Sequence, residues 1–272
     1  MGIGPTFPRT PYVTSSFKIT ADNQLVVIGC GPRIPEVLGK QGHSLAEVDV
    51  WIVPSLCSSQ MAGLIEVAAQ MRFDFEKKPV LLAPMSIMDG IIKTVMPSLS
   101  EYSRKIGKTA RFDDFFNVAT CREMKIKETV SNETYTLSLI PHEKKSDTSY
   151  GVLIEEVPML ITGTKKFDLD WLMFYGGDAK AILYDINTNI LDTADEMNNL
   201  QSKLPTSVFN STWLYGYNLS FHPKNYTNFN FLAPNTAIFD SKRILPVIDK
   251  FGKEKIEAIK KRTSDEPVRL EA

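Results

Sequence analysis

The chain has 272 residues, and its 31 Lys and Arg residues nearly balance its 32 Asp and Glu residues. The resulting net charge of −1 and the isoelectric point near 6.3 exclude the strongly basic surface of a nucleic-acid-binding domain. Three cysteines, Cys30, Cys57 and Cys121, are too few and too scattered for a disulfide framework, which favours a reducing compartment.

The sequence also predicts that the chain has no membrane-spanning segment and forms a single domain. The first residues lack the apolar core of a signal peptide, and no stretch of about 18 apolar residues could span a membrane. We therefore expect a cytoplasmic protein that has neither nucleic acid nor a membrane among its partners. The 43% hydrophobic content suits a single domain over residues 1–272, with an N-terminal arm at 1–14 and a flexible tail at 263–272.

The first third of the chain predicts short strands that alternate with helices. Apolar periodicity places the elements, and turns rich in Gly, Pro, Asp and Asn separate them. The expected elements are, in order, strands at 16–20 and 24–28, a short helix ending near Gly39, a strand at 48–53, a helix after Gln60, a strand at 79–83 and a pair of helices over 84–102 broken near Pro97.

The rest of the chain predicts mainly strands, followed by a few helices. The expected strands lie at 116–121, 124–129, 134–140, 150–155, 159–161, 168–175, 181–184, 212–217 and 236–239, and the expected helices at 192–200 and 245–262. Two long stretches of strands, each followed by helices, indicate an α/β protein in which two packed sheets are flanked by helices.

The segment Val48–Leu64, with the sequence V-D-V-W-I-V-P-S-L-C-S-S-Q-M-A-G-L, resembles a known metal-binding motif. In the metallo-β-lactamase fold, the same strand, turn and helix carry T-H-x-H-x-D-H-x-x-G-L, whose His and Asp side chains hold two metal ions. Gly63 and Leu64 match this motif. The places of its metal ligands are taken by Ser55, Cys57, Ser59 and Gln60.

Further landmarks resemble one branch of this fold, which contains ribonuclease Z and the phage anti-Pycsar phosphodiesterases that cleave cyclic nucleotides. They follow in the expected order over roughly residues 15 to 240. Ile28-Gly29-Cys30-Gly31 is similar to a strand end I-D-C-G, and His142 stands where a later strand places a metal-binding His. The resemblance implies a metallo-β-lactamase-like αββα four-layer sandwich.

The remaining landmarks lie in the second half of the chain. Phe174–Asp178 resembles the strand end Y-S-G-D-T, which makes Asp178 the acid that bridges two metals. Asp185 keeps the acid of a strand ending in H-D, and Asp192 stands in the place of the catalytic His. Gly216, in Trp213-Leu214-Tyr215-Gly216-Tyr217, replaces the last metal His of W-L-Y-H-Y.

Most donors of the implied metal site are missing. Zinc needs imidazole, thiolate or carboxylate donors, and of seven ligand positions only His142 and Asp178 keep one. Cys57 could complete a three-donor site with them, or it could be a small buried hydrophobe beside a hydrogen-bonded His142. We therefore expect no metal, no other cofactor and no enzymatic activity, with Asp185 and Asp192 as vestigial catalytic positions.

The main functional hypothesis is a catalytically inactive protein that binds other proteins or itself. The aromatic segment Phe209–Phe231 suits an interface, with Tyr226 and Phe229 as candidate contacts, or it simply fills the core. The resemblance implies a phage origin, so the protein would form a homo-oligomer or a larger assembly, including a virion, in the host-cell cytoplasm.

Two alternatives stay open. In the first, the chain is a pseudoenzyme that binds and sequesters a cyclic nucleotide, which makes a small nucleotide its partner. In the second, it is a residual metal-dependent phosphodiesterase. The scarcity of basic residues in the landmark loops, where only Lys165 and Lys166 stand out, weakens the first alternative.

Overall fold

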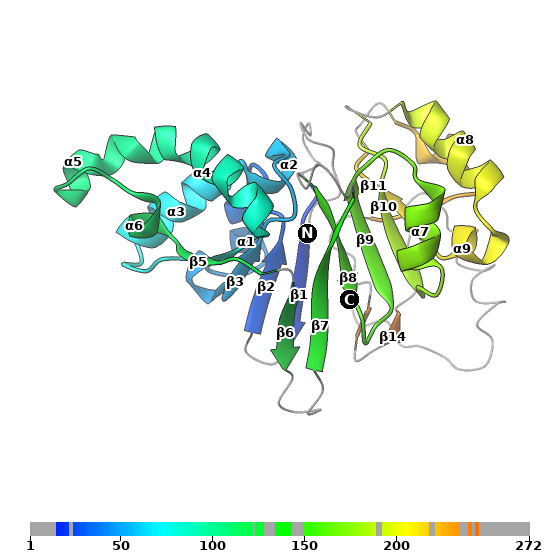
Figure 1. The fold of residues 1–272 in the computed structure, drawn as a ribbon, viewed down its shortest axis with the longest axis horizontal. Helices are drawn as coiled ribbons and strands as arrows, with labels where there is room; N and C mark the ends of the chain where they lie inside the picture. The colour runs from blue at the N-terminus through cyan, green and yellow to red at the C-terminus, as the bar shows by residue number, and fades with distance from the viewer. Residues whose placement is uncertain are drawn as a thin grey trace.

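Two β-sheets lie side by side at the centre of the molecule, and helices cover the outer face of each (Figure 1). This computed structural model describes residues 15–21, 24–121, 123–127, 134–142, 149–188, 192–217, 221–233, 239–240 and 243–244. The expected arm at 1–14, the helix at 245–262, the tail at 263–272 and most of the strand at 236–239 lie outside these residues. Within them, no helix is long and apolar enough to cross a membrane.

The first sheet has five strands in the order β1-β2-β3-β4-β5, and only the β1–β2 pair is antiparallel. The strands are β1 (Phe17–Ala21), β2 (Gln24–Ile28), β3 (Val50–Ile52), β4 (Val80–Leu82) and β5 (Asn117–Ala119). The helices on this side are α1 (Ile34–Lys40), α2 (Ser58–Met61), α3 (Leu64–Phe73), α4 (Met85–Leu99), α5 (Ser103–Ile106) and α6 (Phe112–Phe115). The short helices η1 (Leu45–Glu47) and η2 (Ser100–Tyr102) join them.

The second sheet has seven strands in the order β12-β11-β10-β9-β8-β7-β6. The strands are β6 (Glu123–Lys127), β7 (Thr134–Pro141), β8 (Tyr150–Ile154), β9 (Met159–Thr164), β10 (Ala181–Asp185), β11 (Thr212–Tyr215) and β12 (Asn230–Phe231). Strands β6 to β9 are antiparallel, whereas β9 to β12 are parallel. Helices α7 (Leu169–Gly176), α8 (Thr193–Lys203) and α9 (Thr206–Asn210) lie on this side, followed by η3 (Pro223–Asn225) and the small pair β13 (Phe239–Asp240) and β14 (Arg243–Ile244).

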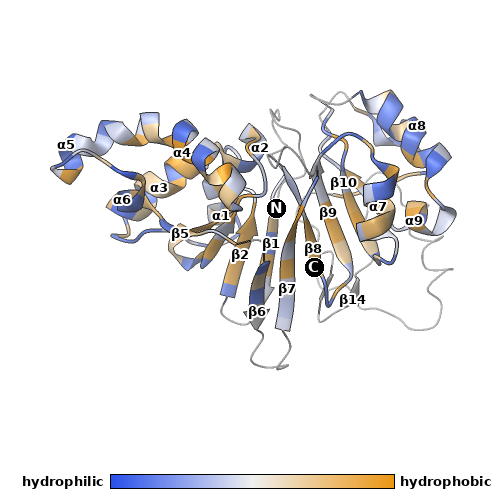
Figure 2. Cartoon of the chain, viewed as in Figure 1, coloured by the Kyte–Doolittle hydropathy of each residue, from blue (hydrophilic) through white to orange (hydrophobic). Residues whose placement is uncertain are grey.

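The apolar residues of the parallel strands form the hydrophobic core. In β10 every residue is buried, and in β2 every residue after Gln24 is buried, as parallel strands covered on both faces require. Figure 2 shows hydrophobic residues along the strands of both sheets and polar residues on the outer faces of the helices. The expected order of helices, sheet, sheet and helices is therefore confirmed.

The prediction of a strand at 168–175 is wrong, because this segment forms helix α7. Asp168 caps the helix, since its side chain accepts a hydrogen bond from the backbone N–H of Trp171 at 3.0 Å. Trp171, Leu172 and Gly176 lie buried on one face, which is a helical spacing. The aromatic run favoured a strand by composition, but the capping Asp and this periodicity decide the outcome.

The predicted break of the helix pair near Pro97 is also wrong. Helix α4 continues through Pro97 to Leu99 and passes directly into η2. Its buried stripe of Ile87, Met88, Ile91, Val95 and Leu99 extends past the proline. Burial of this stripe holds the last turn in place although Pro97 donates no backbone hydrogen bond.

Candidate functional site

The candidate site lies where several strands end at the boundary between the two sheets. The carboxyl ends of β3, β9, β10 and β11 lead into Pro54, Thr164, Asp185 and Gly216, and ligand sites of α/β proteins form at such ends. The sheets are joined here, because Ser55 pairs with Ser149 in a β-bridge and the Tyr150 N–H donates to the Pro54 carbonyl at 2.9 Å. We call Ser55, His142, Ser149, Thr164, Asp185 and Gly216 the strand-end cluster.

The turn after β3 is held by hydrogen bonds among its own polar groups. The Cys57 N–H donates to Ser55 Oγ at 3.2 Å, and the Ser59 hydroxyl donates to Cys57 Sγ at 3.1 Å. Ser55, Ser59 and Gln60 are buried. The two serine hydroxyls make hydrogen bonds within the turn, and hydroxyl and amide groups are poor metal donors.

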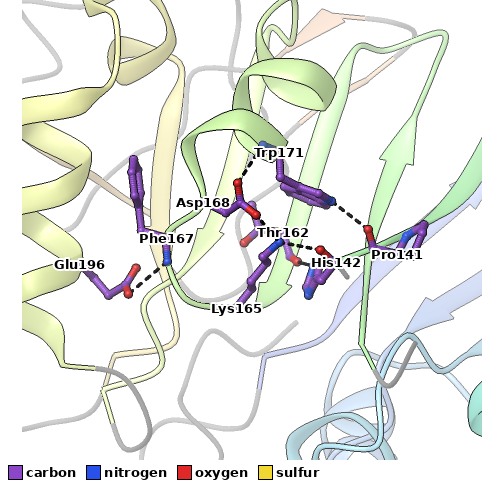
Figure 3. A network of polar contacts seen from close by, with 8 residues as sticks. All are labelled: Pro141, His142, Thr162, Lys165, Phe167, Asp168, Trp171 and Glu196. Atoms are coloured by element: carbon purple, nitrogen blue, oxygen red, sulfur yellow. Dashed lines mark hydrogen bonds and ion pairs between the residues drawn. The ribbon is translucent and has the colours of Figure 1, made fainter. Parts of the chain in front are cut away.

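His142 follows β7 and is buried against Trp171, whose ring meets the imidazole edge-on at 5.0 Å (Figure 3). Its Nε2 lies 2.6 Å from the Thr162 carbonyl oxygen, so Nε2 carries the proton and donates it. Burial lowers the pKa of His142 to about 4, and the nearby Lys165 adds to the shift. At neutral pH this ring is uncharged, and its Nε2 offers no lone pair.

Lys165 holds the backbone around His142 in place. Its ammonium group donates to the His142 carbonyl at 2.8 Å and pairs with Asp168 at 2.9 Å, as Figure 3 shows. The indole N–H of Trp171 donates to the Pro141 carbonyl at 2.9 Å, and Glu196 accepts from the Phe167 N–H at 3.2 Å. The network places one cation immediately after the end of β9.

Asp185 is the buried acid of the cluster. Its two carboxyl oxygens accept hydrogen bonds from the Thr164 hydroxyl at 2.5 Å and from the Asn187 N–H at 2.9 Å. Its own N–H donates to the Thr162 hydroxyl at 3.1 Å. Burial raises the pKa of Asp185 to about 6, although the two hydrogen bonds act in the opposite direction.

Two glycines at landmark positions lie against side chains of neighbouring segments. Gly216 has φ +84°, and a Cβ atom there would overlap Asp185 Oδ1 and lie 2.9 Å from the Asn187 nitrogen. Gly29 has φ +79°, and a Cβ atom there would overlap Gln60 Oε1. The resemblance places a metal-binding His at Gly216 and an Asp at Gly29. In this chain the neighbouring side chains fill both spaces, so a His at position 216 does not fit.

The structure does not bring Asp178 into the cluster. Asp178 is exposed in the turn before β10, whereas Asp185 ends that strand, so the two acids are separated by the strand length of roughly 13 Å. The neighbour of Asp185 on β9 is Thr164. The sequence analysis did not identify Thr162 and Thr164. The pattern that could have indicated them is the Thr-Gly-Thr sequence at the end of an apolar strand, in which Gly163 has φ +65°.

Asp192 and the two aromatic interface candidates make contacts that stabilise the fold. Asp192 is exposed and caps α8, since its side chain accepts from the N–H groups of Ala194 and Asp195. Phe229 is 5% exposed and packs edge-on against Phe209, and Tyr226 stacks on Phe221 at 5.0 Å. These contacts favour the core-filling alternative for the aromatic segment, and self-association stays a prediction.

The donor set does not fit a metal pair. Among the residues that the structure describes, no three His, Cys, Asp or Glu side chains gather closely enough to hold an ion. Cys57, His142 and Asp178 therefore do not form the three-donor site that was one of the two alternatives from the sequence.

A comparison with known protein families shows which family this chain belongs to. Residues 1–235 match the family described as "Anti-Pycsar protein Apyc1". The chain belongs to this family. It is 24% identical to the anti-Pycsar protein Apyc1 of Paenibacillus harenae over 223 residues, which cover 80% of this chain and 88% of the relative. A second relative with this name, from Saccharibacillus brassicae, is 27% identical over 132 residues, which are 48% of this chain and 52% of the relative.

Solved structures confirm the metallo-β-lactamase-like fold. The metallo-β-lactamase fold protein YhfI of Bacillus subtilis is similar with a TM-score of 0.58 at 11% identity, over 85% of this chain and 93% of that protein. The short form of human tRNase Z is similar with a TM-score of 0.52 at 12% identity, over 91% and 98% of the two chains.

The family match overturns the main functional hypothesis from the sequence. A structural, protein-binding or virion component and the absence of enzymatic activity were inferred from the lost metal ligands, and both interpretations are wrong for a member of the anti-Pycsar Apyc1 family. The loss of individual donors did not decide which family the chain belongs to.

We predict that Gly216→Ala lowers the free energy of unfolding more than Gly42→Ala. Gly42 has φ +81° with no atom near its missing Cβ, so alanine there should cost only the backbone strain of about 1–2 kcal/mol. At Gly216 the overlap of the new methyl group with Asp185 should lower the free energy of unfolding by a further amount of about 1–3 kcal/mol. Urea denaturation of both variants measures the difference. Equal costs would show that Asp185 does not fill this space.

Asp185→Asn should stabilise the protein in a pH-dependent way. The pKa of Asp185 is raised to about 6 in the fold, so ionisation above that pH costs stability that a neutral amide avoids. The gain should approach about 3 kcal/mol at pH 8 and vanish towards pH 4, where the unfolded chain also starts to bind the proton.

Denaturation curves at several pH values measure the gain from Asp185→Asn. The exposed turn residue Asp178 provides the control, as Asp178→Asn. If the free energies of unfolding of the wild type and Asp185→Asn differ by the same amount at every pH, the raised pKa of the buried Asp185 carboxyl is contradicted.

Proposed function

We propose that this chain is an anti-Pycsar protein that acts on a cyclic nucleotide inside an infected bacterial cell. The observation that carries the proposal is the family match over residues 1–235, a range that includes the whole strand-end cluster. The match with the Paenibacillus harenae relative covers most of both chains, which supports the same role for this chain. The degradation of cyclic nucleotides is the chemistry that the resemblance implies.

Groups at the strand-end cluster support a phosphate-bearing ligand. Lys165 supplies a cation next to the end of β9, and phosphate oxygens bind ammonium and hydroxyl donors well. Ser149 Oγ is buried and makes no hydrogen bond within the described residues, so its hydroxyl is free to donate to a ligand. We infer that the cyclic phosphate lies near Lys165 and Ser149. The site of action would be the host-cell cytoplasm, where a nucleotide signal is found.

The experiment measures the free concentration of a cyclic nucleotide in the presence of the protein. Cyclic AMP, GMP, CMP and UMP are each incubated with the full chain, and the filtrate after ultrafiltration is quantified by chromatography together with any linear nucleotide. We expect the free concentration of at least one of them to fall, with linear product marking turnover. Unchanged free concentrations of all four, with protein in excess, would contradict the proposal.

Two adjacent lysines provide a matched pair that tests where the ligand binds. The Lys165 side chain is 14% exposed and lies in the cluster, whereas Lys166 is exposed. We expect Lys165→Gln to weaken the depletion of the nucleotide by about tenfold or more, and Lys166→Gln to change it little. Thermal melting confirms that both variants are folded. Equal effects of the two substitutions would place the ligand elsewhere and leave the function itself standing.

A further inference from the structure

The metal-ligand positions of the strand-end cluster carry few metal donors, and at Gly216 a neighbouring side chain takes the place of the ligand. We propose that this protein acts on its nucleotide without a metal ion, because hydroxyl and amide groups replace most of the donors and because Asp185 lies where the side chain of a His at position 216 would begin. The inference rests on the proposed function for its nucleotide, but the binding of metal can be measured on its own.

The first argument concerns the donors. Ser55, Ser59 and Gln60 offer hydroxyl and amide oxygens, which bind zinc and similar ions weakly compared with imidazole or carboxylate. His142 is the one imidazole in the cluster, and its Nε2–H donates a hydrogen bond to the Thr162 carbonyl oxygen. Only Nδ1 keeps a lone pair, and a single imidazole nitrogen does not make a site.

The second argument concerns space. A His at position 216 would need a Cβ atom where Asp185 Oδ1 lies, and the backbone of Gly216, at φ +84°, disfavours any residue with a side chain. On the other side of the turn, Gln60 Oε1 occupies the place of a side chain at Gly29. At Gly216 the backbone nitrogen of Asn187 also lies 2.9 Å from the added Cβ atom, so a His there has no room, whereas at Gly29 the contact is with the end of the Gln60 side chain.

The third argument concerns charge. Two divalent ions bring four positive charges, which metal sites balance with several carboxylates. Within the described part of the cluster, Asp185 is the one buried carboxyl group, and both of its oxygens already accept hydrogen bonds from Thr164 and Asn187. The cluster therefore offers one carboxyl group, already hydrogen-bonded, against the charge of two divalent ions.

The consequence concerns how the ligand is held. With no ion to neutralise it, the phosphate charge must be met by hydrogen-bond donors and by an ammonium group. Lys165 is already held by the His142 carbonyl and by its ion pair with Asp168, so its ammonium group lies at the end of β9 as a fixed hydrogen-bond donor. The binding of the nucleotide should therefore be insensitive to chelators.

The test has two measurements on the native full-length chain. In the first, the protein is dialysed against zinc or manganese and then against buffer, and bound metal is determined by mass spectrometry. We expect far less than one ion per chain and no change in melting temperature on adding either metal. One or more ions bound per chain would overturn the inference.

The second measurement repeats the nucleotide-depletion assay in a chelator and in added manganese or zinc. We expect depletion in the two conditions to agree within about twofold. Depletion that appears only with metal would overturn metal independence and leave the anti-Pycsar role intact. The absence of depletion in both conditions would instead contradict the proposed function, so the two failures are distinguishable.

Discussion

The carboxyl group of Asp185 ends the buried strand β10, and the surrounding groups are arranged around it. Thr164 and Asn187 donate to its two oxygens, and Gly216 has no side chain where one oxygen lies. An unpaired carboxylate in such a position would be costly, and burial accordingly makes the acid weak. The strand ends on both sides, at Thr164 and at Gly216, are therefore adapted to this one group.

The same region shows how a fold can persist while its site changes. Gly63, between α2 and α3, lies against the backbone of Cys30 and Gly31, where a side chain would not fit. These packing requirements belong to the strand–turn–helix unit and do not depend on the ligands that the turn carries. Fold and family therefore remain recognisable at 24% identity and less, although Ser55, Ser59 and Gln60 replace the donors.

The sequence predicted the layers of the fold well, because continuous apolar runs such as those of β2 and β10 mark buried parallel strands. It failed at residues 168–175, where aromatic content outweighed the capping Asp168. That error moved the bridging acid to Asp178, at the wrong end of β10, and hid Thr164. The proximity of His142 to Thr162 and of Gly216 to Asp185 depends on contacts between distant segments, which no local pattern encodes.

The central claim is that Asp185 closes the site at Gly216, and a double-mutant cycle tests it most directly. Gly216→Ala is measured by denaturation in the wild-type background and in an Asp185→Ala background. If the two groups compete for the same space, alanine at 216 should cost at least about 1 kcal/mol less once the carboxyl is removed. The same cost in both backgrounds would contradict the account.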